Sequence, residues 1–325
     1  MASPLFWQRA GLQKRTRGEL ISAAVPRLAL FAIISAKVAA NSPFRQFAKR
    51  WLFQLFPDSL YRLAQACMMA WDIRTRSWYE PEIDVLRYAV RPGEQVLDVG
   101  ANFGIYTYYL SRLVGANGRV YAFEPIPWTR SVFKVVARLL RIRNAQLVPL
   151  GCGDCEETVM FRIPRQPAGA VSAGLAYLAR RDSQPSRAEE ALEVEARMTP
   201  LDSFFPSRGD FSFLKCDVEG AELLVFKGAV KIIESSHPTV LAEVVPRRLE
   251  ALAGSARELV EFFRARDYSR YVYHAEDQPR LGAIDADADL QREGNYLFIH
   301  PSRLERFAVL LQTRDGERPV RDSLK

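Results

Sequence analysis

The sequence has no apolar run long enough to cross a lipid bilayer. Its apolar N-terminal stretch, residues 28–36, ends at Lys37, whereas a membrane-spanning helix needs about 20 apolar residues. A secretory leader would combine a basic start, a short apolar core and small residues such as those at 38–40. Because this apolar core is weak and the basic leader is long, a signal peptide is the less favoured interpretation.

Cysteine and histidine are also scarce, with four Cys and three His in 325 residues. Cys152 and Cys155 have the C-x-x-C spacing of a redox or metal pair, but a zinc site needs a second pair of ligands. The remaining cysteines and the histidines show no such pairing. We therefore expect no metal and no disulfide scaffold, and a reducing, cytoplasmic location.

Acidic residues are sparse in the N-terminal quarter. Residues 1–80 hold 12 of the 45 Lys and Arg but only 4 of the 38 Asp and Glu, so the whole positive excess lies there. Apolar residues at 44, 47, 51 and 55, and again Leu60, Leu63, Cys67 and Trp71, repeat at helical spacing. This basic helical extension is predicted either to pack as a cap on the main domain or to contact an anionic membrane, at its inner face.

After residue 93 the chain alternates between strand and helix. Short apolar strands are predicted at 96–100, 119–124, 146–150, 212–217, 239–245, 270–274 and 295–299. This alternation is typical of a doubly wound, largely parallel sheet with helices on both faces. Residues 158–163 and 192–196 resemble extra strands around a long insertion at 164–190, which is either a substrate lid or a disordered loop.

Residues 96–107, Val-Leu-Asp-Val-Gly-Ala-Asn-Phe-Gly-Ile-Tyr-Thr, combine a buried strand, a glycine turn and the start of a helix. Glu124 follows at the end of the next strand, where a carboxylate can accept hydrogen bonds from ribose hydroxyls. The turn lacks the G-x-G-x-x-G spacing that places a pyrophosphate on a helix N-terminus. A nucleoside without phosphate, S-adenosylmethionine, therefore suits Asp98 and Asn102 better than a nicotinamide dinucleotide does.

A second dense motif occupies residues 211–222, Phe-Ser-Phe-Leu-Lys-Cys-Asp-Val-Glu-Gly-Ala-Glu. Lys215, Asp217 and Glu219 occupy every second position, so in extended conformation they point to one side. Asp217 falls at the carboxyl end of the strand, where α/β sheets bind ligands. A salt-linked strand end would explain Glu222 in the following helix but not the other two carboxylates.

Together the two motifs make the chain resemble the FkbM family of S-adenosylmethionine-dependent methyltransferases. The similarity covers about residues 93–245 and also includes Phe123-Glu-Pro125, Gly151-Cys-Gly-Asp154, Leu201-Asp-Ser-Phe204, Gly228-Ala229 and Pro238-Thr-Val-Leu-Ala-Glu243. Cys216 replaces the aliphatic residue usual in the family, and the first 80 residues match nothing in it. The resemblance implies a class I, Rossmann-like fold with a seven-stranded sheet at 81–325, after an N-terminal helical extension at 1–80.

The resemblance also implies the roles of individual residues. The methionine end of the donor would be held by Asp98, Gly100, Asn102 and Gly104, and Thr107 closes this cofactor-binding motif. Glu124 would bind the ribose, and Asp154 would bind the adenine amino group. Glu219 would lie near the sulfonium. The implied reaction is methyl transfer to an oxygen, often a sugar hydroxyl of a glycolipid, polysaccharide or natural product.

An alcohol is a poor nucleophile until its proton leaves, so a base must lie within hydrogen-bond reach. Asp217 is the first candidate and Glu243, at the end of the fifth strand, the second; His237 lies at the wrong end of that strand. A rival interpretation is a non-catalytic, membrane-associated scaffold that retains the fold. A nucleic-acid enzyme is disfavoured, because no base-stacking aromatics follow Asp217 and the catalytic portion is nearly neutral.

Overall fold

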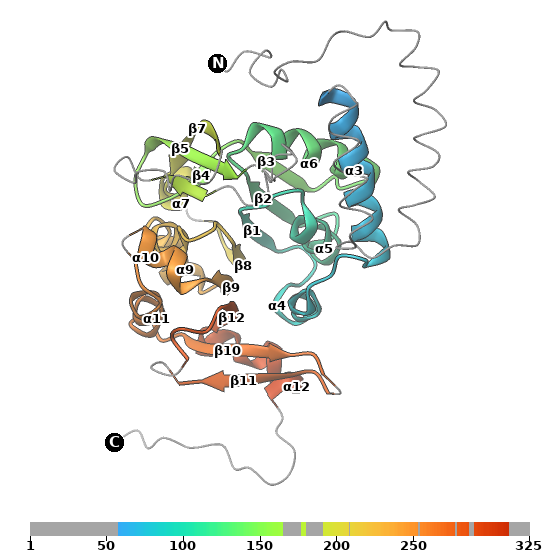
Figure 1. Ribbon diagram of the computed structural model, residues 1–325. Coiled ribbons are helices and arrows are strands. Elements are labelled where there is room, and N and C mark those ends of the chain that lie inside the picture. Colours follow the sequence, from blue (N-terminus) through green and yellow to red (C-terminus); the bar gives the residue numbers. More distant parts are fainter. Residues whose placement is uncertain are drawn as a thin grey trace, which may run out of the picture.

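Strands and helices alternate along most of the chain (Figure 1). The computed structural model describes residues 58–164, 177–179, 191–207, 209–252, 254–276, 278–285 and 289–311. In spatial order, the main sheet contains β11 (Arg280–Ile284), β10 (Ser269–His274), β12 (Gly294–Ile299), β9 (Thr239–Val244), β8 (Phe211–Cys216), β1 (Gln95–Val99), β2 (Arg119–Phe123) and β3 (Ala145–Val148).

The five strands from β3 to β9 run parallel, and β12, β10 and β11 each run antiparallel to the preceding strand in the sheet. The chain winds from β1 outward to β3 and then returns to β8 on the other side of β1. The strand order therefore reverses between β1 and β8, and ligands of open α/β sheets bind at such a switch point. This is the class I methyltransferase fold.

Helices cover both faces of the sheet. On one face, α8 (Glu222–Lys227), α9 (Val230–Ser236), α10 (Pro246–Ala251) and α11 (Ala256–Arg264) enclose a core with Leu97, Val99 and Phe123. On the other face, α4 (Leu86–Ala89), α5 (Ile105–Val114) and α12 (Ala308–Leu311) pack with Val96 and Phe213. Each central strand is thus buried on both sides, which explains its almost continuous apolar sequence.

A second sheet lies beside the first, with strands in the order β4 (Gly151–Cys152), β7 (Ala191–Thr199), β5 (Glu157–Pro164) and β6 (Tyr177–Ala179). Alternate residues of β5 and β7, among them Phe161, Ile163 and Met198, pack against α6 (Pro127–Leu139). The short α7 (Leu201–Phe204) returns the chain to β8. The second sheet therefore extends the molecule beyond the carboxyl end of β2, beside the switch point.

Helix α3 (Asp58–Thr75) packs along α6, with Tyr61, Met69 and Ile73 buried between them (Figure 1). The helix expected around residues 60–71 occurs, but the predicted apolar face is wrong: Leu63 and Trp71 are each 43% exposed. The face that packs includes Ala66 and Ala70, whose small side chains let the two helices approach closely. The described part of the extension is therefore a cap on the domain.

The seven strands expected from the sequence all occur, within one or two residues of the predicted bounds. The main sheet has eight strands where seven were expected, because β11 adds an antiparallel edge strand next to β10. β11 has only five residues, and of these only Leu281 is buried. The expected helix near 44–55 lies outside the described residues, as does the proposed lid except for residues 164 and 177–179. No helix in the described ranges combines the length and apolarity needed to cross a bilayer.

Gly100 determines how closely β1 and β8 approach at the switch point. Its φ is +80°, and a Cβ at this position would collide with the backbone carbonyl of Asp217. The adjacent hydrogen bond, from the Asp217 N–H to the Val99 carbonyl at 3.0 Å, fixes the same approach. A glycine is thus required here by the neighbouring strand as well as by the turn.

We expect Gly100→Ala to lower the free energy of unfolding by roughly 3 kcal/mol, from positive-φ strain plus the collision with β8. Gly93→Ala is the matched control, because Gly93 has a φ of +87° but open space around its Cβ position; it should cost about 1–2 kcal/mol. Urea unfolding of both variants measures the difference. Equal losses would show that the approach of β8 does not constrain residue 100.

Candidate active site

A cavity opens at the carboxyl ends of β1, β2, β8 and β9. Seven of the ten residues expected at the site line it: Asp98, Gly100, Asn102, Glu124, Asp217, Glu219 and Glu243. The structure therefore gathers residues separated by up to 145 positions into one pocket. All seven come from strand ends or from the turns that follow them.

Asp98 lies on β1 and is 1% exposed. Its carboxylate accepts a hydrogen bond from the Thr107 hydroxyl, which comes from the first turns of α5. Burial raises the pKa of Asp98 to about 6, although the Thr107 hydrogen bond and the Lys215 charge oppose that shift. Thr107 does not line the cavity; it orients the carboxylate that does.

Glu124 follows β2 and is 6% exposed. Its two oxygens accept hydrogen bonds from the backbone N–H groups of Asn102, at 3.0 Å, and Ile126, at 2.8 Å. Burial raises its pKa to about 7 despite these two bonds. Each carboxylate oxygen has a further lone pair, so the side chain can still accept from a ligand hydroxyl. Glu124 thus connects the turn after β1 to the turn after β2 through hydrogen bonds, and it lines the cavity.

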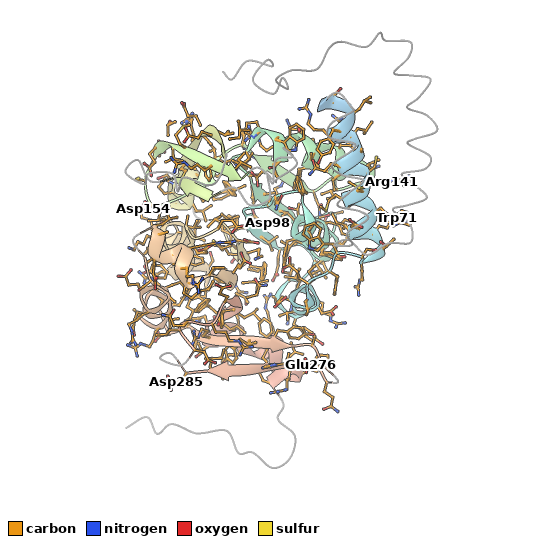
Figure 2. All side chains as sticks on the ribbon, viewed as in Figure 1. Trp71, Asp98, Arg141, Asp154, Glu276 and Asp285 are labelled. Atoms are coloured by element: carbon orange, nitrogen blue, oxygen red, sulfur yellow. The ribbon has the colours of Figure 1, made fainter. Side chains whose placement is uncertain are left out.

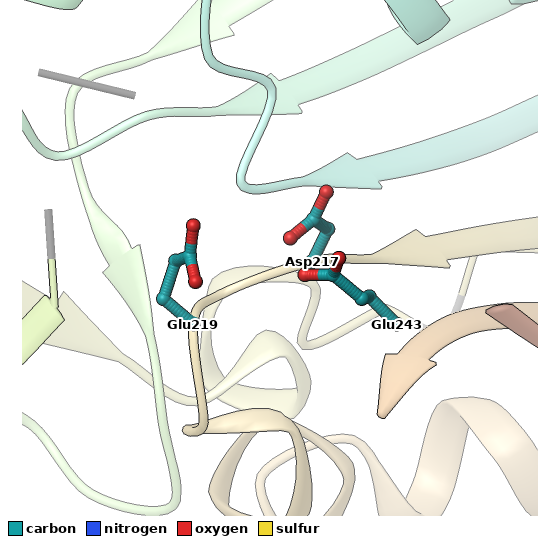
Figure 3. A group of neighbouring side chains, drawn as sticks. All are labelled: Asp217, Glu219 and Glu243. Carbon is teal, nitrogen blue, oxygen red and sulfur yellow. The ribbon is translucent and has the colours of Figure 1, made fainter. Parts of the chain in front are cut away.

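Asp217 and Glu243 end the neighbouring strands β8 and β9, and Figure 3 shows their carboxyl groups side by side. Burial, followed by the charge of Asp217 and a hydrogen bond between the two groups, raises the pKa of Glu243 to about 8. The pair therefore holds a proton to a higher pH than an isolated glutamate would.

Lys215 lies beneath this pair and is 1% exposed. Its Nζ is 3.5 Å from Asp217 Oδ2 and 4.9 Å from the ring centroid of Tyr106. Burial lowers the pKa of this ammonium, but the charges of Asp217, Glu80 and Glu243 outweigh burial and raise it. The group is therefore a permanent cation under the cavity floor.

Glu219 departs from the expected extended conformation, because β8 ends at Cys216 and Glu219 has a φ of +58°. Its carboxylate forms an ion pair with Arg248, which is 3.8 Å from Glu243. Oxygens of Asp217, Glu219 and Glu243 lie within 4.8 Å of one another, a spacing that could suit a metal ion. However, the positive charges of Lys215 and Arg248 already compensate much of the negative charge of these three carboxyl groups.

Gly104 and Asp154 are not brought to the cavity. Gly104 has a φ of +91° and serves as the N-cap of α5. Asp154 is exposed in the loop after β4, and Figure 2 shows it well to the side of Asp98. Its expected contact with an adenine amino group remains a prediction that this geometry does not favour.

The sequence analysis missed both ends of the cavity. At one end lie Ile126, Cys152, Phe161 and Met198, an apolar wall supplied mostly by the second sheet. At the other end lie Trp78 and Glu80, from the segment after α3, next to Tyr106. The alternation of apolar residues in β5 and β7 could have indicated the apolar wall. No sequence pattern indicated that Trp78 and Glu80 would line the cavity.

Comparison with curated proteins gives short matches to ribosomal RNA large subunit methyltransferase E. The protein of Legionella pneumophila (strain Lens) is 36% identical over 81 residues, and that of Buchnera aphidicola subsp. Schizaphis graminum is 32% identical over 81 residues. Each match covers 25% of this chain and 37% of the relative. The chain therefore spans little more than a third of the curated relatives that it matches.

Among solved structures, methyltransferase FkbM from Methylobacillus flagellatus KT is 15% identical, with a TM-score of 0.41, and covers 86% of this chain and 60% of its own. Aeropyrum pernix fibrillarin, solved with natively bound S-adenosyl-L-methionine, is 13% identical with a TM-score of 0.37, at 67% and 72% coverage. The methyltransferase FkbM domain model matches residues 98–270, more than half of the chain. The chain therefore belongs to the FkbM methyltransferase family, whose methyl donor is S-adenosylmethionine.

Proposed function

We propose that this protein transfers the methyl group of S-adenosylmethionine to a hydroxyl oxygen of a sugar, glycolipid, polysaccharide or natural product. The observation that carries the proposal is the Asp217–Glu243 pair at the cavity floor. The two carboxyl groups lie side by side, and burial and the charge of Asp217 raise the pKa of Glu243 to about 8, so the pair is suited to take up the proton of a hydroxyl. A hydroxyl needs such a proton acceptor, whereas a stronger nucleophile would not.

The cavity fits the donor. Asn102 Oδ1 is buried without a partner among the described residues, Glu124 retains acceptor capacity, and the Ile126–Met198 wall suits an apolar base. We therefore assign the nucleoside to the end lined by Glu124 and Met198, and the methionine portion to the β1 turn. When bound, the donor supplies an electrophilic methyl group on a positively charged sulfur.

The chain's own residues then align and deprotonate the acceptor. Methyl transfer is an in-line displacement, so most of the rate comes from holding the oxygen at near-attack distance. As the oxygen–carbon bond forms, the carbon–sulfur bond breaks with its electron pair remaining on sulfur, and Asp217 takes the hydroxyl proton. Glu243 holds Asp217 in place through their hydrogen bond, and Lys215 balances its charge from below.

The acidic cavity favours a neutral acceptor over a nucleic acid. Glu80, Asp217, Glu219 and Glu243 all line it, and phosphates would be repelled by these carboxylates. The curated relatives are named for ribosomal RNA, but their matches span only a quarter of this chain. We therefore propose that the acceptor is not RNA or DNA.

We expect Asp217→Asn to lower turnover by about 10²–10⁴-fold, because the amide cannot accept the hydroxyl proton. Affinity for S-adenosylhomocysteine, which lacks the sulfonium charge, should change little when measured by isothermal titration calorimetry. Loss of donor binding would make Asp217 a cofactor ligand instead of the base. Absence of any heat with the unmodified protein would favour the non-catalytic scaffold.

Donor binding should depend on pH through Glu243. The sulfonium is positively charged and favours ionised Glu243, so S-adenosylmethionine should bind more tightly as pH rises through about 8. S-adenosylhomocysteine is the matched ligand because it lacks the sulfonium charge, and its affinity should vary less over the same range. Calorimetry from pH 6.5 to 9 measures both.

Glu243→Gln retains a hydrogen-bond donor toward Asp217 but cannot titrate. In this variant the difference in affinity between S-adenosylmethionine and S-adenosylhomocysteine should no longer change with pH. A pH dependence equal for both ligands in the unmodified protein would contradict a role for Glu243 in sensing the donor charge.

We also propose that the N-terminal segment holds the enzyme at the inner, anionic face of a membrane, in the cytoplasm. Residues 1–57 contain nine Lys and Arg but only one acidic residue, Glu19, so nearly all of the excess charge precedes α3. Juxtamembrane basic residues contribute about 1 kcal/mol each near an anionic surface.

The full-length protein should float with vesicles containing 30% phosphatidylserine at low salt and dissociate at high salt, because the attraction is electrostatic. Vesicles of phosphatidylcholine alone should not carry it. A triple variant, Lys14→Glu, Arg15→Glu and Arg17→Glu, should weaken flotation strongly. Equal flotation with neutral vesicles would contradict the electrostatic contact.

A further inference from the structure

The cavity has a second end that the donor assignment leaves unused. Trp78 and Glu80 line this end, together with Tyr106 from the first turn of α5. Asp217 and Glu243 lie at its floor, whereas the residues of the nucleoside end come from β2 and the second sheet. Contacts from Glu80 through Tyr106 and Lys215 lead to Asp217. An acceptor whose oxygen reaches Asp217 can therefore also contact Glu80 and its neighbour Trp78.

Trp78 presents part of its ring to the cavity. The residue is 39% exposed, lines the cavity and belongs to none of the hydrophobic clusters found within the described ranges. The exposed part of an indole outside the core can cover an apolar ligand face. Its position at the cavity makes that ligand the acceptor.

Glu80 is held in place from inside the protein. Its Oε2 accepts a hydrogen bond of 2.6 Å from the Tyr106 hydroxyl, and the Tyr106 ring lies over the Lys215 ammonium. Tyr106 itself is only 7% exposed. A carboxylate accepts hydrogen bonds and donates none, so the remaining lone pairs of Glu80 can accept from ligand hydroxyls or amines.

We propose that Trp78 and Glu80 form the acceptor subsite, and that it binds a neutral sugar ring. The C–H face of the ring lies against the indole, neighbouring hydroxyls donate to Glu80, and one hydroxyl reaches Asp217. The proposal rests on the methyl transfer proposed above and narrows its acceptor to a carbohydrate.

The local charges favour this neutral polyol over an anionic acceptor. Glu80, Asp217, Glu219 and Glu243 line the cavity together with Asp98, whereas Lys215 and Arg248 supply two positive charges nearby. This excess of carboxyl groups repels an anion, whereas a neutral sugar adds no charge and offers hydroxyl donors to the carboxylates.

The test uses saturation-transfer NMR on the full-length protein saturated with S-adenosylhomocysteine. The probes are methyl glycosides of glucose, galactose, mannose and rhamnose, each measured alone. At least one should receive saturation, mostly at C–H protons of one ring face. Trp78→Ala should weaken its affinity about tenfold or more, and Trp78→Phe should retain most of it.

Trp71→Ala is the matched control, because Trp71 is similarly exposed but lies on α3 and does not line the cavity (Figure 2). Its affinity for the glycoside should equal that of the unmodified protein. Glu80→Gln should also weaken glycoside binding about tenfold, while calorimetry shows unchanged binding of S-adenosylhomocysteine.

Three outcomes would overturn the subsite: no glycoside receives saturation, Trp78→Ala and Trp71→Ala behave alike, or ethanolamine binds through Glu80 in place of the sugars. The proposed methyl transfer fails by a separate measurement, the absence of heat with S-adenosylmethionine. Donor binding without glycoside binding would therefore reject the subsite alone.

Discussion

The buried ammonium of Lys215 organises the floor of this site. A fully buried charge costs several kcal/mol unless opposite charges and dipoles compensate it. Here the compensation comes from separate chain segments: Asp217 on its own strand, Glu243 on the next strand and Glu80 before the main domain. The Tyr106 ring adds its π face. Electrostatic compensation of one cation thus draws together the proton acceptor, its partner and the segment that carries Trp78.

Glu124 plays the corresponding part on the nucleoside side. Two backbone N–H groups from different turns converge on its carboxylate, so the β1 and β2 turns are joined through one side chain. Because both bonds lie inside the protein, the carboxylate keeps its position before a ligand arrives. Preorganisation of this kind reduces the entropy lost on binding. The two sides of the cavity are therefore built alike, each around one buried charged group.

The sequence predicted those features that depend on strand ends. Asp98, Glu124, Asp217 and Glu243 each follow or end a buried apolar strand, and parallel strands bring such ends to one edge. The failures have a common physical origin in packing between elements. The buried face of α3 was decided by small residues, Ala66 and Ala70, that contact α6, and not by its largest apolar side chains.

The same reasoning explains the residues that lie elsewhere than expected. Asp154 follows the two-residue strand β4 of the second sheet, so it does not share the edge of the main strands. Trp78 and Glu80 reach the cavity only because α3 packs on α6 and returns the chain beneath α5, a path without any local sequence signal. Long-range packing, and not residue type, placed them.

Charge balance links the two ends of the cavity into a single chemical unit. Before the donor binds, the carboxyl groups exceed the nearby protein cations, and the proton held by the Asp217–Glu243 pair reduces the excess. The sulfonium offsets part of what remains, and it loses its charge on methyl transfer just as Asp217 acquires the hydroxyl proton. The proton released by the acceptor thus replaces the charge lost from sulfur. A floor of paired carboxyl groups over a buried lysine therefore suits transfer to a neutral hydroxyl, because an anionic acceptor would release no proton to replace that charge.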